Sequence, residues 1–340
     1  MSELGLKGKF MKRMVKIAGY AAIAIAIVYS GYWFIAASFI KTRIDLAFSH
    51  KPPIGRLNLG DITVTGFPQN FDINIRDFSL AHDNTFRWST PGARLSAASL
   101  DPTRLDIDLS RPHAIGGRWG DMVLDTERAQ VIALFGKTTL LPLQDLRFAL
   151  EGAKLGHSNG LGLAAEKIIA VIKNREGEDP GVYSVETEIT GTDITKIFPE
   201  LPNNYRRLGP IRGSANIFFT SGWAAGDLTA SLPVFRGAIL EKLSASIGNS
   251  ELNLNGTLQI NPDSSVSGNV TLTITQWREL LNLAKLVGKI DGEGEEVFAE
   301  ILSEVEALSG KPGTLELPLV IKNGAVTYGV FTLGVIPPIR

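Results

Sequence analysis

The sequence predicts an α+β protein that is rich in β-structure and begins with one transmembrane helix. Three observations predict this class. Residues 17–40 form an uncharged apolar run, most of the later chain alternates apolar and polar residues, and two segments near the C-terminus repeat at helical spacing. We expect extended, mostly antiparallel twisted sheets after the anchor, with two amphipathic helices near the C-terminus.

The first element is the uncharged run of 24 residues between Lys16 and Lys41. As an α-helix it would extend roughly 36 Å, against about 30 Å for the hydrocarbon core of a bilayer. Backbone groups inside hydrocarbon need hydrogen-bond partners within the segment, which a single run obtains only as a helix. Residues 17–40 are therefore predicted to cross a membrane.

Basic residues dominate the tail before this run, so the positive-inside rule predicts a cytoplasmic tail over residues 1–16 and a translocated body. An alternative is a cleaved signal peptide, with Ala36-Ala37-Ser38 as the small-residue site. Signal h-regions of about 7–15 residues are shorter than this run, which favours the anchor. The tail residues concerned are Lys7, Lys9, Lys12, Arg13 and Lys16, against one Glu3.

Beyond the tail the chain keeps 29 basic and 34 acidic residues, a formal charge of −5 against −1 for the whole sequence. The body of the protein therefore has no excess of positive charge with which to bind nucleic acid. The chain has no Cys, which an extracytoplasmic location permits without requiring it.

Period-two alternation predicts strands along most of the body. Residues 252–260 and 270–274 are predicted to form an antiparallel β-hairpin with one solvent-exposed face. The alternation changes phase between Ile75 and Phe78, which suggests a β-bulge. Further strands are expected at 104–109 and 183–189 and near 57–65, 93–100, 145–150, 214–220 and 226–232.

Helices are predicted near 276–289, from the spacing of Trp277, Leu280, Leu281, Ala284 and Val287, and near 294–308 before Gly310 and Pro312. The second is acidic, which favours packing on the sheet over lying on a membrane surface. Residues 162–174 are ambiguous between helix and strand, and their β-branched content favours strand.

The proline-containing segment 192–210 is the best candidate boundary between two β-rich sub-domains. The expected division is a linker over 41–56, one sub-domain over 57–191 and a second over 211–340 that contains both helices.

One catalytic pattern occurs, since residues 156–160 read Gly-His-Ser-Asn-Gly and match the G-x-S-x-G nucleophile elbow of α/β-hydrolases. That motif needs a helix after the serine and a histidine later in the chain, and no histidine follows Ser158. A loop between strands explains the match better than a serine esterase. The sequence has four histidines, His50, His82, His113 and His157.

These histidines are widely separated and are expected at surface or loop positions, without metal-ligand spacing. Asp106 and Asp108 could be a pair for acid–base chemistry, but their alternation with apolar residues next to Arg104 predicts a solvated strand face. We therefore expect no catalytic, cofactor-binding or metal-binding residues, and no lipid-binding residue can be assigned.

Three stretches resemble a family of uncharacterised Gram-negative proteins, defined as a domain of unknown function. They are Gly66-Phe67-Pro68 with the strand 71–75 and Trp88 near Pro91, residues 251–260 with the Gly268 strand and Trp277 helix, and residues 317–324 with Gly329, Leu333-Gly334 and Pro337. The resemblance implies an anchor in the bacterial inner membrane, a cytoplasmic N-terminus and a periplasmic β-rich body. By architecture alone, the chain is also similar to AsmA-like and TamB-like envelope proteins, whose curved sheets present an apolar groove for lipid passage.

Two functional hypotheses follow. The first is a non-enzymatic protein whose apolar sheet face handles envelope lipids, unless the 276–308 helices simply close that face into an ordinary core. The second is a scaffold or adaptor that contacts another membrane or periplasmic protein through an edge strand or the acidic helix.

Overall fold

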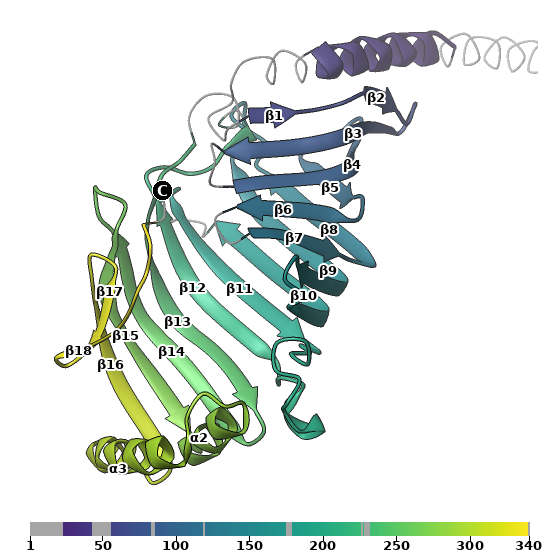
Figure 1. Ribbon diagram of the computed structural model, residues 1–340. Helices are drawn as coiled ribbons and strands as arrows, with labels where there is room; N and C mark the ends of the chain where they lie inside the picture. The colour runs from purple at the N-terminus through teal and green to yellow at the C-terminus, as the bar shows by residue number, and fades with distance from the viewer. Residues whose placement is uncertain are drawn as a thin grey trace, which may run out of the picture.

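The computed structural model describes residues 23–42, 56–82, 86–117, 120–174, 179–225, 227 and 232–338. Within these ranges eighteen strands belong to one antiparallel sheet. Figure 1 shows the sheet curving from the N-terminal helix at one end to two helices at the other. The predicted β-rich α+β class is confirmed.

The first half of the sheet is a meander in which several long strands are broken in two. β4 pairs with β5 along one half and with β6 along the other, and β9 pairs with β8 and β7 in the same way. The strands are β1 (Arg56–Asn58), β2 (Ile62–Thr65), β3 (Asn70–His82), β4 (Phe86–Ala98), β5 (Arg104–Leu109), β6 (His113–Gly117), β7 (Gly120–Asp125), β8 (Arg128–Phe135) and β9 (Leu143–His157).

The second half continues from β9 by pairing each strand with the next along the chain. Residues 162–174, ambiguous by sequence, are strand. The strands are β10 (Gly162–Asn174), β11 (Val182–Thr190), β12 (Ile211–Phe219), β13 (Phe235–Ile247), β14 (Ser250–Ile260), β15 (Val266–Thr275), β16 (Thr314–Lys322), β17 (Ala325–Tyr328) and β18 (Phe331–Val335).

A crease crosses the first half of the sheet where the strands break. In β3, Asp77 adopts a left-handed φ of 50°, and in β9 Gly152 does so with a φ of 59°. The expected β-bulge between Ile75 and Phe78 is wrong, because the pairing of β3 with β4 keeps one register through this point. The alternation of apolar and polar residues instead changes phase in β3 at Asp77 and in β9 at Gly152, where these strands cross the crease.

Two helices cover one end of the apolar sheet face, as their sequence spacing predicted. α2 (Trp277–Leu286) and α3 (Gly292–Ser309) bury Trp277 and Val305 against Leu315 of β16. Asp291 caps the N-terminus of α3, because its carboxylate accepts a hydrogen bond from the Gly294 amide at 2.7 Å.

The N-terminal helix (Ile23–Thr42) is long and apolar enough to cross a membrane, a test that a signal sequence near the N-terminus would also pass. It packs along the edge of the sheet at β2 and β3 (Figure 1). Trp33 stacks on Phe71 with ring centroids 5.5 Å apart, and its indole nitrogen donates to the Asn70 carbonyl at 3.0 Å. One face of the helix is thus held by the body of the protein.

Some expectations fall on residues outside the described ranges. The predicted tail (1–16), the start of the predicted span (17–22) and most of the linker and of the strand expected at 226–232 lie there. Segment 192–210 contains one short 3₁₀ helix, η1 (Asn203–Tyr205), and the strands on either side of it, β11 and β12, pair with each other. The division into two sub-domains stays a prediction.

Candidate functional site

The pairing register places a continuous row of apolar residues across eight strands on one face of the sheet. Directly paired residues share a face, and so do residues two apart along a strand. Adjacent members of the row are paired in every case. The row is Leu146, Ile172, Val185, Ala215, Leu240, Gly256, Val270 and Leu319.

The neighbouring row, one residue along each strand, points to the opposite face and is mostly polar. It consists of Asp145, Lys173, Ser184, Asn216, Ile239, Thr257, Asn269 and Val320. The sheet is therefore apolar on one side and mainly polar on the other.

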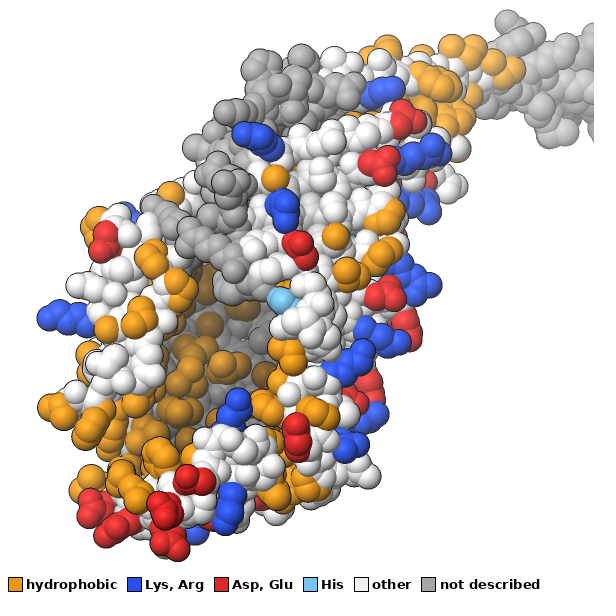
Figure 2. Space-filling model, viewed as in Figure 1, with side chains coloured by type: hydrophobic (Ala, Val, Ile, Leu, Met, Phe, Trp, Pro, Cys, Tyr) orange, Lys and Arg blue, Asp and Glu red, His pale blue; other side chains and the backbone are white. Residues whose placement is uncertain are grey.

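The apolar side is hollowed. Figure 2 shows hydrophobic side chains lining the hollow in front of the second half of the sheet, with charged side chains gathered along its outer edges. Val266, Val270, Leu319 and Ile321 form a buried cluster at one end of this surface, near β17. We call the apolar side of the sheet the concave face.

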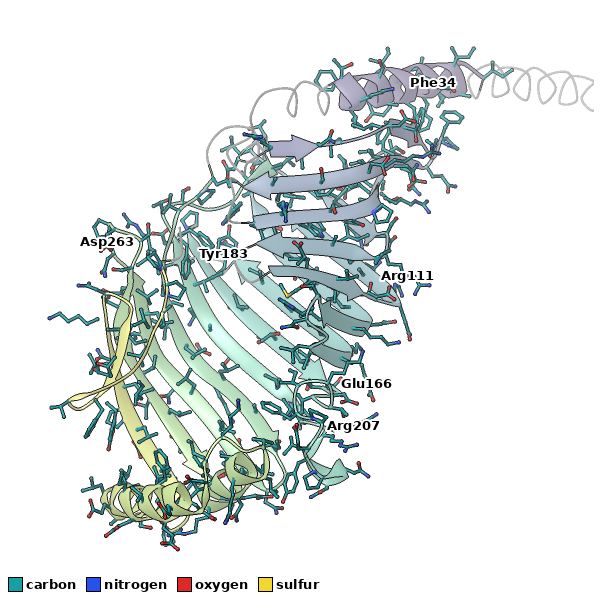
Figure 3. The ribbon with its side chains drawn as sticks, in the orientation of Figure 1. Phe34, Arg111, Glu166, Tyr183, Arg207 and Asp263 are labelled. Atoms are coloured by element: carbon teal, nitrogen blue, oxygen red, sulfur yellow. The ribbon has the colours of Figure 1, made fainter. Side chains whose placement is uncertain are left out.

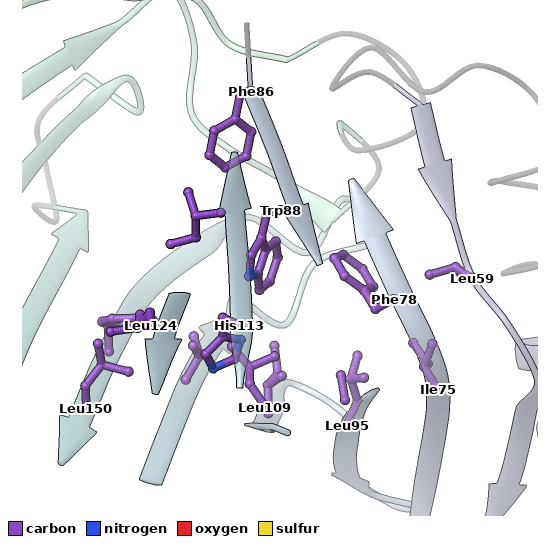
Figure 4. A pocket seen from close by; sticks show the side chains of 15 residues that line it. Leu59, Ile75, Phe78, Phe86, Trp88, Leu95, Leu109, His113, Leu124 and Leu150 are labelled. Carbon is purple, nitrogen blue, oxygen red and sulfur yellow. The ribbon is translucent and has the colours of Figure 1, made fainter. Parts of the chain in front are cut away.

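In the first half of the sheet the concave face contains a cavity of about 630 Å³, a size typical of small-molecule sites (Figure 4). Residues from both sides of the crease line it, since the phase change keeps Ile75 and Phe78 on the same side. The lining residues are Leu59, Ile75, Phe78, Phe86, Trp88, Ala93, Leu95, Ile107, Leu109, His113, Ile115, Leu124, Val131, Phe148 and Leu150.

His113 is the one ionisable side chain among the residues that line this cavity. It is 2% exposed, and its Nδ1 has no hydrogen-bond partner among the described residues. Burial lowers the pKa of the imidazole below its usual range, and Asp125 offsets part of that shift. The expectation that every histidine is a surface or loop residue is wrong here, because His113 opens β6 on the buried side.

Sequence reasoning missed the burial of His113, because β6 is too short for its alternation to show which of its two faces is buried. His113 and Ile115 are separated by Ala114, and glycines follow. The available signal was the spacing of two, which places His113 on the same face as Ile115.

Exposed ion pairs join neighbouring segments of the sheet. Arg212 contacts Glu188 at 2.8 Å. Arg207, in the segment between β11 and β12, contacts Glu166 of β10 at 3.2 Å, and Figure 3 shows the two close together. Such exposed pairs contribute little stability.

The Gly156–Gly160 motif lacks the setting of a nucleophile elbow. Ser158 lies in the turn between β9 and β10, so a strand follows it in place of a helix. Its hydroxyl lies 3.5 Å from Nδ1 of the adjacent His157, at an exposed position. This is the loop between strands that the sequence favoured.

Asp106 and Asp108 lie on the polar side, as expected. Asp106 forms a bidentate pair with Arg104, which lowers the pKa of the carboxyl. Asp108 is exposed and its Cα pairs with that of Arg94. Within the described ranges, no group of three or more His, Asp or Glu residues could hold a metal ion. His50 and the side chain of His82 are outside those ranges.

The fold and the concave face together define a class of protein, in which a curved antiparallel sheet has one apolar side and is preceded by an apolar N-terminal helix. Residues 33–337 match the family described as uncharacterized protein conserved in bacteria (DUF2125), and the chain belongs to that family. No curated protein and no solved structure matches the chain. The likeness to AsmA-like and TamB-like proteins therefore stays a prediction.

Proposed function

We propose that the concave face binds the acyl chains of lipids, in a protein anchored in the bacterial inner membrane with its body in the periplasm. The observation that carries this proposal is the eight-residue apolar row, which runs without a charged member from β9 to β16. Acyl chains are long and uncharged, so they match a surface that is extended in one direction and lacks polar groups.

The C-terminal helices do not account for the whole of this face. α2 and α3 pack on the ends of β15 and β16, through Ile274, Leu315 and Leu317. Val185, Ala215 and Leu240 lie in the row but outside that cluster, and Figure 2 shows the hollow open in front of this part of the sheet. A continuous apolar face that the helices leave uncovered supports the proposal of a binding role.

The N-terminal helix supports a membrane source for the ligand. Phe71, on which Trp33 of the helix stacks, lies on the same face of β3 as Ile75 of the cavity. Phe67 and Leu100, in turns beside the helix, are 45% and 80% exposed. The apolar surface thus continues from the proposed membrane segment into the cavity.

The test uses the full chain in bacterial membranes with the photo-crosslinker p-benzoylphenylalanine at Val185. A matched control carries it at Ser184, the adjacent residue of β11, whose side chain points to the polar face. After irradiation, mass spectrometry of the purified protein should detect lipid adducts at 185 and few or none at 184. Equal labelling at both positions, or none at either, would refute acyl-chain binding by the concave face.

A second candidate, an adaptor for another envelope protein, is favoured by the free edge of the sheet. β18 pairs only with β17 among the described strands, and its Phe331 and Leu333 are 68% and 59% exposed. An exposed apolar edge can accept a strand from another chain. The same crosslinker at Phe331 should then capture a protein partner in stoichiometric amount, while position 185 yields no lipid.

A further inference from the structure

We propose that the turn containing Leu100 inserts into the bilayer beside the N-terminal helix, so that the body of the protein contacts the lipids of the periplasmic leaflet directly. This inference rests on the part of the proposed function that makes the helix a membrane anchor, and it adds a second membrane contact. It is carried by the level at which the helix leaves the body and by the apolar side chains at that level.

The N-terminal helix has a bare part and a part that the body covers. Ile25 and Val28 are exposed. Further along the helix Trp33 and Ala37 are buried, because they pack in one cluster with Phe71 of β3. The helix therefore leaves the body between Val28 and Trp33.

The part of the apolar run before the body is too short to cross a bilayer. The uncharged run begins at Ile17, and residues 17–28 would extend roughly 18 Å as a helix, against about 30 Å of hydrocarbon. The missing length requires about eight more residues, to about residue 36. Because the helix runs alongside the body there, segments of the body at the level of residues 29–36 share the outer part of the bilayer with it.

Hydrogen bonds fix two turns of the body at this level of the helix. The Tyr29 hydroxyl donates to the Pro68 carbonyl at 2.5 Å and lies 2.7 Å from the Ser99 hydroxyl. The Tyr32 hydroxyl donates to the Ser99 carbonyl at 3.2 Å. The β2–β3 and β4–β5 turns are thus held at a set depth by tyrosines, which are enriched where a membrane meets water.

The surface at this level is apolar. Leu100, which is 80% exposed, helps to form an apolar groove of about 640 Å³ between its turn and the helix. The groove is lined by Ala24, Ile25, Val28, Tyr29, Tyr32 and Leu100. Leu100 therefore lies beside the bare part of the helix, where acyl chains of the bilayer would cover apolar surface that water hydrates unfavourably.

Charged side chains next to the two turns are paired. Asp101, the neighbour of Leu100, pairs with Lys137 at 3.1 Å, and Asp72 pairs with Arg94 at 2.9 Å. An unpaired charge near hydrocarbon would be strongly unfavourable, so this pairing is compatible with a position at the bilayer surface.

The experiment measures the depth of position 100 by electron paramagnetic resonance. The chain has no Cys, so Leu100→Cys, Ile25→Cys and Leu308→Cys each provide one site for a nitroxide label. Position 25 is the reference for hydrocarbon, and position 308 in α3, where Leu is 83% exposed, is the reference for water. The full chain is reconstituted in nanodiscs of phosphatidylethanolamine and phosphatidylglycerol. Label collisions are measured with oxygen, which dissolves in lipid, and with a polar nickel chelate, which stays in water.

The ratio of oxygen to nickel collisions at position 100 should exceed the ratio at position 308 by roughly tenfold or more, because hydrocarbon excludes the nickel chelate. It should approach the ratio at position 25. A second measurement needs no label: p-benzoylphenylalanine at position 100 should form lipid adducts in membranes, and at position 308 few or none.

The outcomes separate this inference from the proposed function. Hydrocarbon at position 25 with water at position 100 overturns insertion of the turn and leaves the anchor intact. Protection of position 100 from both reagents would indicate a protein in the groove and also overturns insertion. Water at both positions overturns the anchor and this inference together. Lipid adducts at position 100 without adducts at Val185 support insertion and overturn acyl-chain binding by the concave face.

Discussion

A single carboxylate on the concave face should abolish lipid binding, whereas the same carboxylate one residue away should not. Ala215 lies in the middle of β12, between Val185 and Leu240 on the neighbouring strands. Ser214 lies between Glu186 and Lys242 on the polar face. The two residues are both half-buried, so Ala215→Asp and Ser214→Asp form a matched pair.

The expected magnitude follows from the medium that each aspartate meets. When lipid fills the concave face, Asp at position 215 sits among acyl chains, an environment that disfavours Asp by about 2.5–3.5 kcal/mol. That energy corresponds to roughly a 100-fold loss of lipid affinity. At position 214 the carboxylate stays in water, and a change within about 0.5 kcal/mol is expected.

The assay measures lipid that copurifies with the full-length variants from membranes, normalised to protein by mass spectrometry. Thermal unfolding of both variants in nanodiscs is the control for folding, and their Tm values should agree within a few degrees. The reasoning is refuted if Ala215→Asp folds normally and retains as much bound lipid as Ser214→Asp.

Three further predictions concern the crease, the helical end and the cavity. Gly152→Ala should lower the free energy of unfolding by about 1–2 kcal/mol, because a φ of 59° disfavours a side chain and a Cβ would meet the Glu127 side chain at 2.6 Å. Gly152→Asn should recover part of this loss in denaturant titrations, because asparagine tolerates a left-handed φ better than alanine does. Glu306 accepts hydrogen bonds from the Gly313 amide and Arg278, which hold its pKa below the ordinary 4.5, so its stabilising effect is present above pH 4.5 and is lost as the pH falls through the folded-state pKa. The Tm of Glu306→Gln should therefore lie below that of wild type at pH 7, with the gap closing in acid; a gap independent of pH contradicts this. For His113 the folded-state pKa lies below 6.5, so the unfolded chain binds more protons and the wild-type protein loses stability as the pH falls below about 6.5. His113→Leu should lack this loss in a pH series of Tm values, and an unchanged acid profile would count against a buried, neutral imidazole.

Local sequence pattern predicted a large part of the fold, because the spacing of apolar residues within a strand or helix shows which of its sides is buried. The alternation at 252–260 and 270–274 corresponds to β14 and β15, and the helical spacing near 276–289 and 294–308 corresponds to α2 and α3. These elements have one apolar side over at least two turns or three alternating pairs, so the period is unambiguous. Residues 162–174 were harder because Ile168 to Ile172 is apolar on both faces.

Sequence reasoning failed where a feature depends on several strands at once. The change of phase at Ile75 and Phe78 was visible, but its cause was taken to be a bulge in one strand. The crease needs a break at the same level in several strands of the first half, including Asp77 in β3 and Gly152 in β9, which lie on opposite sides of β4 to β8 in the sheet. The sequence of one strand does not show that alignment. The burial of His113 was missed for a local reason, because β6 is only five residues long and ends in glycines, so its alternation does not show which face is buried.

The sequence by itself determined which residues share a face, the β-rich class, the two C-terminal helices and the apolar N-terminal segment, because periodicity and hydropathy are properties of neighbouring residues. The tertiary structure decided that the apolar rows of successive strands join into one concave face, that the crease encloses a cavity around His113, and that Trp33 docks the N-terminal helix on Phe71. These features arise from register and curvature between segments far apart in the chain, which local pattern cannot encode.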